Sequence, residues 1–199
     1  HHGSYDLSYL SLIPNLVASA PKDGRELYDL LYTGIHQDKP FSVRYPRGDI
    51  PDEAEYKNGF KPQLIPTGKS EILQEGKDIA LLATGVEVYS ALEAARVLKT
   101  KGVDALVANM RFIKPLNEEI VTKASKCSQG IATVEENTTF GGLGSAVSRE
   151  LQELGLKPPI RYIGLPDEFV AHGTQQELRH SGKLDIEGIV ESLLVITGR

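Results

Sequence analysis

Residues 78–84 read "DIALLAT", a nearly continuous apolar run that ends at a threonine. Such a run is typical of a strand that is covered on both faces, as in a parallel sheet. Thr84 and Glu87 then have the spacing of a capping box, which predicts the start of a helix. The buried side of that helix is predicted from apolar residues at helical spacing, namely Val88, Ala91, Leu92 and Ala95. A buried strand followed by an amphipathic helix is the repeating unit of a parallel α/β fold.

The same alternation continues toward the C-terminus. Further strands are predicted at 103–113 ("VDALVANMRFI"), 130–137 ("GIATVEEN") and 160–166 ("IRYIGLP"). Helical patterns lie between these strands, and two more close the chain. We therefore predict that residues 68–199 form an α/β domain with an open parallel sheet and helices on both faces.

Residues 1–47 carry a second α/β pattern, which reads as loop, strand, helix and strand. The strands are predicted at 16–21 ("LVASAP") and 41–46 ("FSVRYP"), and Asp23 is placed to cap the helix between them. Two strands and one helix are too few to bury both faces of a parallel sheet. We expect the rest of this domain to come from a missing N-terminal part or from another chain. The proline-containing, aperiodic residues 48–67 are predicted to be an interdomain linker.

Composition excludes several classes of protein. The 199 residues carry a net charge of -5 and no basic cluster, which argues against nucleic acid as a partner. No apolar run approaches the ~20 residues of a membrane span. A single cysteine, Cys127, excludes an internal disulfide and fits a reducing, cytoplasmic compartment.

Residues 43–48 read "VRYPRG" and place two arginines at the end of a predicted strand. Ligands bind at such strand ends in parallel sheets, and guanidinium groups match phosphate oxygens. Arg44 lies within the strand and is expected to pair inside the fold. Arg47 follows the proline and projects from the loop, where it could bind a phosphate. The residues alone leave open the alternative that both arginines form ordinary ion pairs at a domain edge.

Other polar segments favour structural roles. The glycines of "FGGLGS" (140–145) match neither a Walker loop nor a dinucleotide fingerprint, so close helix packing is the preferred interpretation. Glu135 and Glu136 are adjacent on a strand and diverge, which predicts solvated or interface charges. The scattered histidines lack the spacing of zinc ligands and are interpreted as structural: His36, His172 and His180.

Four stretches carry a resemblance when they are taken together and in order: 1–23, 41–48, 133–147 and 163–178. They read "HHGSYDLSYLSLIPNLVASAPKD", "FSVRYPRG", "TVEENTTFGGLGSAV" and "IGLPDEFVAHGTQQEL". The chain resembles, over its whole length, the C-terminal part of the 1-deoxy-D-xylulose-5-phosphate synthases, a transketolase-like, thiamine-diphosphate-dependent family. The resemblance implies that a transketolase C-terminal domain (68–199) follows the end of a pyrimidine-binding domain (1–47).

The resemblance also implies an activity and its partners. Pyruvate would lose CO2 with the help of thiamine diphosphate, and the remaining two-carbon unit would join D-glyceraldehyde 3-phosphate. The product, 1-deoxy-D-xylulose 5-phosphate, leads to isoprenoids and to thiamine. Thiamine diphosphate and Mg2+ would be bound mainly by a missing N-terminal part, so this chain is expected to hold no cofactor or metal residues and to be inactive alone. A cytoplasmic homodimer is expected, located in plastids if the source is a plant or alga.

Two residues are implied to act at the site. His1 matches the active-site histidine of the family, and Arg47 matches the arginine that receives the aldehyde's phosphate. His1 and His2 before Gly3-Ser4 could otherwise be the scar of a purification tag. The alternatives for the whole chain are a transketolase, the beta part of a 2-oxo acid dehydrogenase, or a noncatalytic module for dimerisation or docking.

The role of His1 leads to a first prediction. His1→Ala in the intact enzyme should lower turnover more than it weakens cofactor binding, because a histidine there would bind or protonate groups derived from pyruvate. Steady-state kinetics beside cofactor titration measure the two effects. Unchanged turnover would favour the tag origin of His1.

Overall fold

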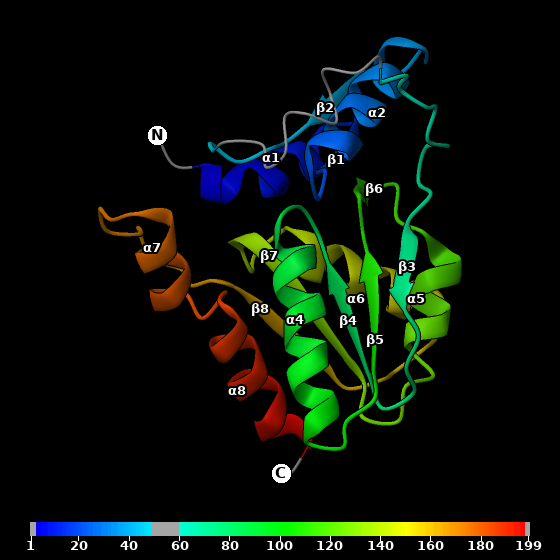
Figure 1. Cartoon of the computed structure of the whole chain (residues 1–199). Coiled ribbons are helices and arrows are strands. Elements are labelled where there is room, and N and C mark those ends of the chain that lie inside the picture. Colours follow the sequence, from blue (N-terminus) through cyan, green and yellow to red (C-terminus); the bar gives the residue numbers. More distant parts are fainter. Residues whose placement is uncertain (1–2, 49–59, 198–199) are drawn as a thin grey trace.

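The computed structural model describes residues 3–48 and 60–197, which form two α/β units built on separate sheets (Figure 1). His1 and most of the predicted linker, residues 49–59, lie outside the described residues. The N-terminal unit faces the carboxyl ends of the strands in the C-terminal unit. No helix within the described parts of the chain is long and apolar enough to cross a membrane.

The C-terminal unit contains the sheet that the sequence predicts. Its strand order is β3-β5-β4-β7-β8. The strands are β3 (Glu71–Gln74), β4 (Ile79–Ala83), β5 (Ala105–Asn109), β7 (Ile131–Thr138) and β8 (Ile160–Leu165). Four strands are parallel, and every residue of the central β4 is buried, which explains its continuous apolar run. The edge strand β3 pairs antiparallel with β5 and was not among the predicted strands.

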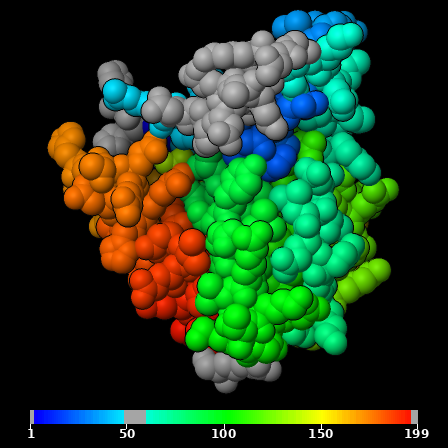
Figure 2. All heavy atoms as spheres, viewed as in Figure 1, coloured from blue at the N-terminus to red at the C-terminus, as the bar shows by residue number. Residues whose placement is uncertain are grey.

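Helices cover both faces of this sheet, as predicted. One face packs against α4 (Glu87–Thr100) and α8 (Ile186–Thr197). The other packs against α5 (Glu118–Ala124) and α6 (Leu143–Glu153). A short helix, α7 (Gln175–Ser181), precedes α8 and lies at the molecular surface (Figure 2).

The predicted strand at 103–113 is in fact two strands in two different sheets. After β5 the chain turns at Met110 and Arg111, and β6 (Phe112–Lys114) pairs antiparallel with a strand of the N-terminal unit. The turn is held from both units, because Met110 N donates to Ala83 O at 2.7 Å and Ala20 N donates to Arg111 O at 2.9 Å. An apolar run shows that a segment is buried, but not which sheet it joins.

The N-terminal unit has the sheet order β2-β1-β6. Its elements are η1 (Gly3–Tyr5), α1 (Asp6–Leu12), β1 (Val17–Ser19), α2 (Gly24–Ile35) and β2 (Phe41–Val43). The two predicted strands and the predicted helix are present, but the predicted opening loop is wrong because η1 and α1 occupy it. Leu7 of α1 is buried in the core of the C-terminal unit, where its N–H donates to Asn137 Oδ1 at 3.2 Å.

The two predicted caps have different outcomes. Asp23 caps α2 as expected, since its Oδ1 accepts a hydrogen bond from Glu26 N at 2.8 Å. The capping box of Thr84 and Glu87 is wrong: the residue before α4 is Val86, with no side-chain cap. Glu87 is instead fully buried.

A buried ion pair joins the two units beneath the turn after β5. Glu26 of α2 is 2% exposed, and its Oε1 lies 2.9 Å from Arg111 Nε. Asn109 Nδ2 donates to the same oxygen at 2.8 Å, while Lys22 N donates to Oε2 at 2.7 Å. Arg111 also pairs with Glu71 at the edge of the larger sheet. The Glu26 carboxylate is therefore compensated by groups from both units.

This arrangement predicts a large cost for removing the arginine. Arg111→Ala should lower the free energy of unfolding by about 3 kcal/mol, because it leaves the buried Glu26 carboxylate with only the more distant Lys22 ammonium, at 3.5 Å, as a cation. Arg149→Ala is the matched control, since its pair with Glu153 is exposed to solvent and its loss should barely change stability. Urea denaturation measures both. Equal, small losses would show that the Glu26 pair does not hold the units together.

Candidate functional site

The candidate site lies where the N-terminal unit meets the carboxyl ends of β4 and β7 (Figure 1). Loops at this end of a parallel sheet are where ligands are usually bound. We call this region the seam and define it by Arg44, Arg47, Glu87, Glu136 and Gln175.

Arg44 pairs within the fold, as predicted. Its Nη1 lies 3.0 Å from Glu136 Oε2 on β7, and its backbone N–H donates to Ser19 O at 2.8 Å. The side chain is only 11% exposed, so this is a largely desolvated pair. Glu136 is thus an interface charge, which is one of the two interpretations that the sequence allows. The pair fixes the start of the "VRYPRG" loop against the C-terminal unit.

Arg47 is exposed at the far end of the same loop. Its carbonyl oxygen accepts a hydrogen bond from the side chain of Gln175 on α7. Within the described part of the chain its guanidinium forms no ion pair. The loop is therefore held by its backbone while the Arg47 side chain is left for solvent or a ligand.

The segment that directly follows His1 and His2 reaches the seam. A Cβ at Gly3 would lie 3.6 Å from Arg44 Nη2 and 3.0 Å from Asp6 Oδ2. Tyr5 of the same turn packs edge-on against Phe169, with the ring centroids 6.4 Å apart. The start of the described chain and the arginine loop therefore lie together, although His1 itself is outside the described residues.

Glu135 is buried, so its interpretation as a solvated charge is wrong. Its carboxylate accepts hydrogen bonds from Leu143 N at 2.7 Å and Gly144 N at 2.9 Å, at the start of α6. Burial raises the pKa of Glu135 to about 7, although both hydrogen bonds act to lower it. The strand thus supplies a buried carboxyl group as hydrogen-bond acceptor for the first amides of the helix.

The glycines of residues 140–145 serve close packing, as the preferred interpretation states. A Cβ at Gly142 would collide with the Glu135 carboxylate, and one at Gly144 would lie 2.8 Å from Thr133 Oγ1. Small residues therefore let the strand and helix approach closely enough for the carboxylate to reach the amides.

Glu87 is a buried seam residue that sequence reasoning assigned to a cap. Its Oε1 lies 3.0 Å from Arg179 Nη2 on α7. Burial is the main cause that raises the pKa of Glu87 to about 7; Arg179 lowers that pKa, and the nearby Glu136 raises it. The spacing from Thr84 suggested a cap, and only the fold shows that the residue points inward.

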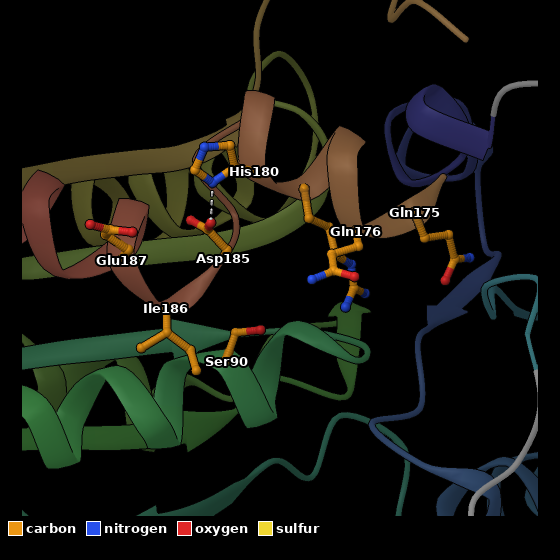
Figure 3. Close-up of a pocket in the computed structure, with 8 residues that line it drawn as sticks. Ser90, Gln175, Gln176, His180, Asp185, Ile186 and Glu187 are labelled. Atoms are coloured by element: carbon orange, nitrogen blue, oxygen red, sulfur yellow. Dashed lines mark hydrogen bonds and ion pairs between the residues drawn. The ribbon is translucent and has the colours of Figure 1, made fainter. Parts of the chain in front are cut away.

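A cleft of about 650 Å³ borders α7 and α8 next to the seam (Figure 3). His180 Nδ1 lies 2.6 Å from Asp185 Oδ2, and this contact raises the pKa of His180. The pair links the end of α7 to the start of α8, in agreement with a structural role for this histidine. Across residues 3–48 and 60–197, no group of three or more His, Cys, Asp or Glu side chains is arranged to hold a metal ion.

Two family models match the chain. The "Transketolase, C-terminal domain" model matches residues 68–189, and the "Transketolase, pyrimidine binding domain" model matches residues 1–53.

Curated relatives are similar over the full chain. A 1-deoxy-D-xylulose-5-phosphate synthase of Dehalococcoides mccartyi is 44% identical over 200 residues, which cover 100% of this chain and 31% of the relative. The synthase of Aquifex aeolicus is 44% identical over 196 residues, covering 97% of this chain and 30% of the relative. The chain thus spans about 30% of the length of these relatives.

A solved structure described as "Split gene transketolase, inactive beta4 tetramer" superposes with a TM-score of 0.82 at 27% identity. The match covers 96% of this chain and 61% of that one. The likeness confirms the predicted fold class of an open-sheet α/β domain preceded by part of a second α/β unit.

The buried Glu135 predicts a pH dependence of stability. Its folded pKa of about 7 lies above the ordinary 4.5, so its contribution to stability is full below about pH 4.5 and is lost as the pH rises through about 7. A shift of this size corresponds to something on the order of 3 kcal/mol. Unfolding free energies from pH 4.5 to 8 should fall less steeply in Glu135→Gln. Glu119→Gln, at an exposed carboxylate, should keep the wild-type slope, and identical slopes for all three proteins would contradict this assignment.

Proposed function

Because this chain belongs to the transketolase family, whose C-terminal domain it carries, we propose that it is the C-terminal part of a 1-deoxy-D-xylulose-5-phosphate synthase. The identity of 44% to curated synthases, against 27% to the transketolase structure, supports the synthase over a transketolase. The domain boundaries at residues 47 and 67 stay predictions.

The proposed reaction joins pyruvate to D-glyceraldehyde 3-phosphate and releases CO2 and 1-deoxy-D-xylulose 5-phosphate. Thiamine diphosphate, when bound, supplies the carbanion chemistry that loss of CO2 from pyruvate requires. Protein groups then have to bind and orient an anionic keto acid and a phosphorylated aldehyde. A positive charge at the seam suits both tasks.

The described residues do not fit the diphosphate and Mg2+ end of the cofactor, because they offer no acidic cluster for the metal. We therefore place thiamine diphosphate and Mg2+ mainly on parts of the protein outside this chain, and we assign no step through them here. The match of residues 1–53 to a pyrimidine-binding domain supports a location of the cofactor's pyrimidine near the N-terminal unit.

The observation that carries the assignment is the exposed guanidinium of Arg47 at the end of a parallel strand. Its loop is fixed on both sides, by the Arg44–Glu136 pair and by Gln175. A phosphate dianion can accept two parallel hydrogen bonds from one guanidinium. We propose that Arg47 binds the phosphate of the aldehyde and that His1 acts at the reacting end of the substrates.

A homodimer and a cytoplasmic location, or a plastid location in a plant or alga, remain parts of the proposal. Exposed apolar side chains on α1 support an interface with a second copy: Tyr9 is 63% exposed and Leu12 is 78% exposed. The single cysteine supports a reducing compartment.

The test uses the full-length protein that contains this chain, assayed with pyruvate and either D-glyceraldehyde 3-phosphate or unphosphorylated glyceraldehyde. Arg47→Ala should lower kcat/KM for the phosphorylated aldehyde by roughly a hundredfold, equivalent to ~3 kcal/mol. The KM for pyruvate should change weakly, and glyceraldehyde should be nearly indifferent because it never used the contact.

Arg44→Ala is the matched control from the same loop. It should lower stability first, because it leaves Glu136 unpaired in a largely buried position. Equal effects of Arg47→Ala on both aldehydes would make Arg47 a structural residue. Absence of condensation by the unmodified full-length protein would overturn the proposed function itself.

A further inference from the structure

Helix α7 is attached to the rest of the molecule in an unusual way. None of its seven residues is buried, so it has no apolar anchor in the core. Its side chains instead make polar contacts to three different elements. Gln175 donates to the Arg47 carbonyl, Arg179 pairs with Glu87 at 3.0 Å, and His180 pairs with Asp185 at 2.6 Å.

The three contacts lie along the helix in a definite order. Figure 3 shows Gln175 on the side of α7 that faces the N-terminal elements, while His180 points to Asp185 at the start of α8. Arg179 lies between them in sequence and contacts the first turn of α4. One end of α7 therefore touches the proposed phosphate-binding loop, and the rest is held by the C-terminal unit.

We propose that α7 positions the Arg47 loop for the phosphorylated substrate, and that Glu87 holds α7 in place through Arg179. Gln175, Arg179 and Glu87 are then positioning residues, since they act through Arg47. The inference rests on the proposed function, because it assigns α7 a role in substrate binding only if Arg47 receives the phosphate.

Glu87 is the strongest of the available anchors because it is fully buried. A buried carboxylate is costly unless a cation compensates it, so its pairing with Arg179 resists displacement of α7 into solvent. The His180–Asp185 pair is more exposed, with 74% of the histidine side chain accessible, and is worth less. Loss of the Glu87 contact should therefore loosen α7 more than loss of the histidine contact.

The charge of the Glu87–Arg179 pair depends on pH. Glu87 is faced by Arg179 from α7, by Glu136 from β7, by Arg44 after β2 and by Ser90 on its own helix. Its raised pKa of about 7 means that the charged pair with Arg179 forms as the pH rises through that value. Binding of the phosphorylated aldehyde should tighten over the same range for a reason separate from titration of the phosphate.

The experiment compares four variants of the full-length enzyme: Gln175→Ala, Arg179→Gln, Glu87→Gln and the control Gln176→Ala. Gln176 is the next residue of the helix and lines the neighbouring cleft. The first three variants should raise KM for D-glyceraldehyde 3-phosphate about three- to tenfold, the range for losing one hydrogen bond. The KM for pyruvate, the kinetics with unphosphorylated glyceraldehyde and the control should stay within about twofold.

Two further readouts separate positioning from general damage. Between pH 6 and 8, the ratio of KM values for Glu87→Gln and wild type should grow with pH, because the two proteins are alike only when Glu87 is protonated. Amide hydrogen exchange should quicken in residues 174–181 and 44–48 of Arg179→Gln and Glu87→Gln, and stay at the wild-type rate elsewhere. Because the substrate phosphate titrates equally in both assays, its effect on KM cancels in the ratio of variant to wild type.

The outcomes are distinct from those that test Arg47. An unchanged KM for the phosphorylated aldehyde in Gln175→Ala, together with faster exchange of α7 in Arg179→Gln, would overturn the positioning role while leaving Arg47 as the phosphate ligand. If Arg47→Ala affects both aldehydes equally, the phosphate-binding role of Arg47 fails, and exchange of the Arg47 loop still shows whether α7 holds it. If Glu87→Gln folds poorly, the KM of the surface variant Gln175→Ala for the phosphorylated aldehyde is enough to test the positioning role of α7.

Discussion

The carboxylate of Glu26 is the constraint on which the arrangement of the two units depends. It is buried where α2 meets the turn after β5, and groups from both units compensate it. Burying a charged carboxylate costs free energy unless it is paired. Because the pairing groups come from both units, the burial of Glu26 is compensated only when the two units are packed together. The pairing places Arg111 at the point where the chain leaves one sheet for the other. Because β6 then pairs antiparallel with β1, the small mixed sheet lies beside the carboxyl ends of β4 and β5 (Figure 1).

Two other buried carboxylates act at neighbouring junctions. Glu135 joins a strand to the first amides of α6, and Glu87 joins α4 to α7. In each case a single acidic side chain fixes one element against another. The proposed substrate site is thus held mainly by polar contacts, whereas the sheet beneath it is held by apolar packing. This division suits the proposed role of the site in binding anionic substrates.

Much of the architecture could be predicted from the sequence, because a parallel strand that is buried on both faces has a continuous run of apolar residues. The run at 78–84 became the central strand, and Asp23 capped the helix as its spacing predicts. The seam could not be predicted in the same way. Residues 103–113 look like one buried strand, since burial in either sheet gives the same apolar pattern. Glu87 looks like a capping residue and Glu135 like a solvated or interface charge, because no local pattern indicates that Arg179 or two helix amides contact them after folding.

The position of β6 makes the two units structurally interdependent, although they are separate segments of the sequence. A β-strand from the second unit completes the small sheet of the first. Ala18 of β1 and Ala20 just after it share a core with Leu106 and Met110. The covalent joint between the units is therefore not the boundary of cooperative folding. A chimera made by exchanging everything before residue 68 for the matching part of another protein would keep a foreign strand in its first sheet. Modular exchange in this architecture has to carry the 110–114 segment along with the unit whose sheet it completes.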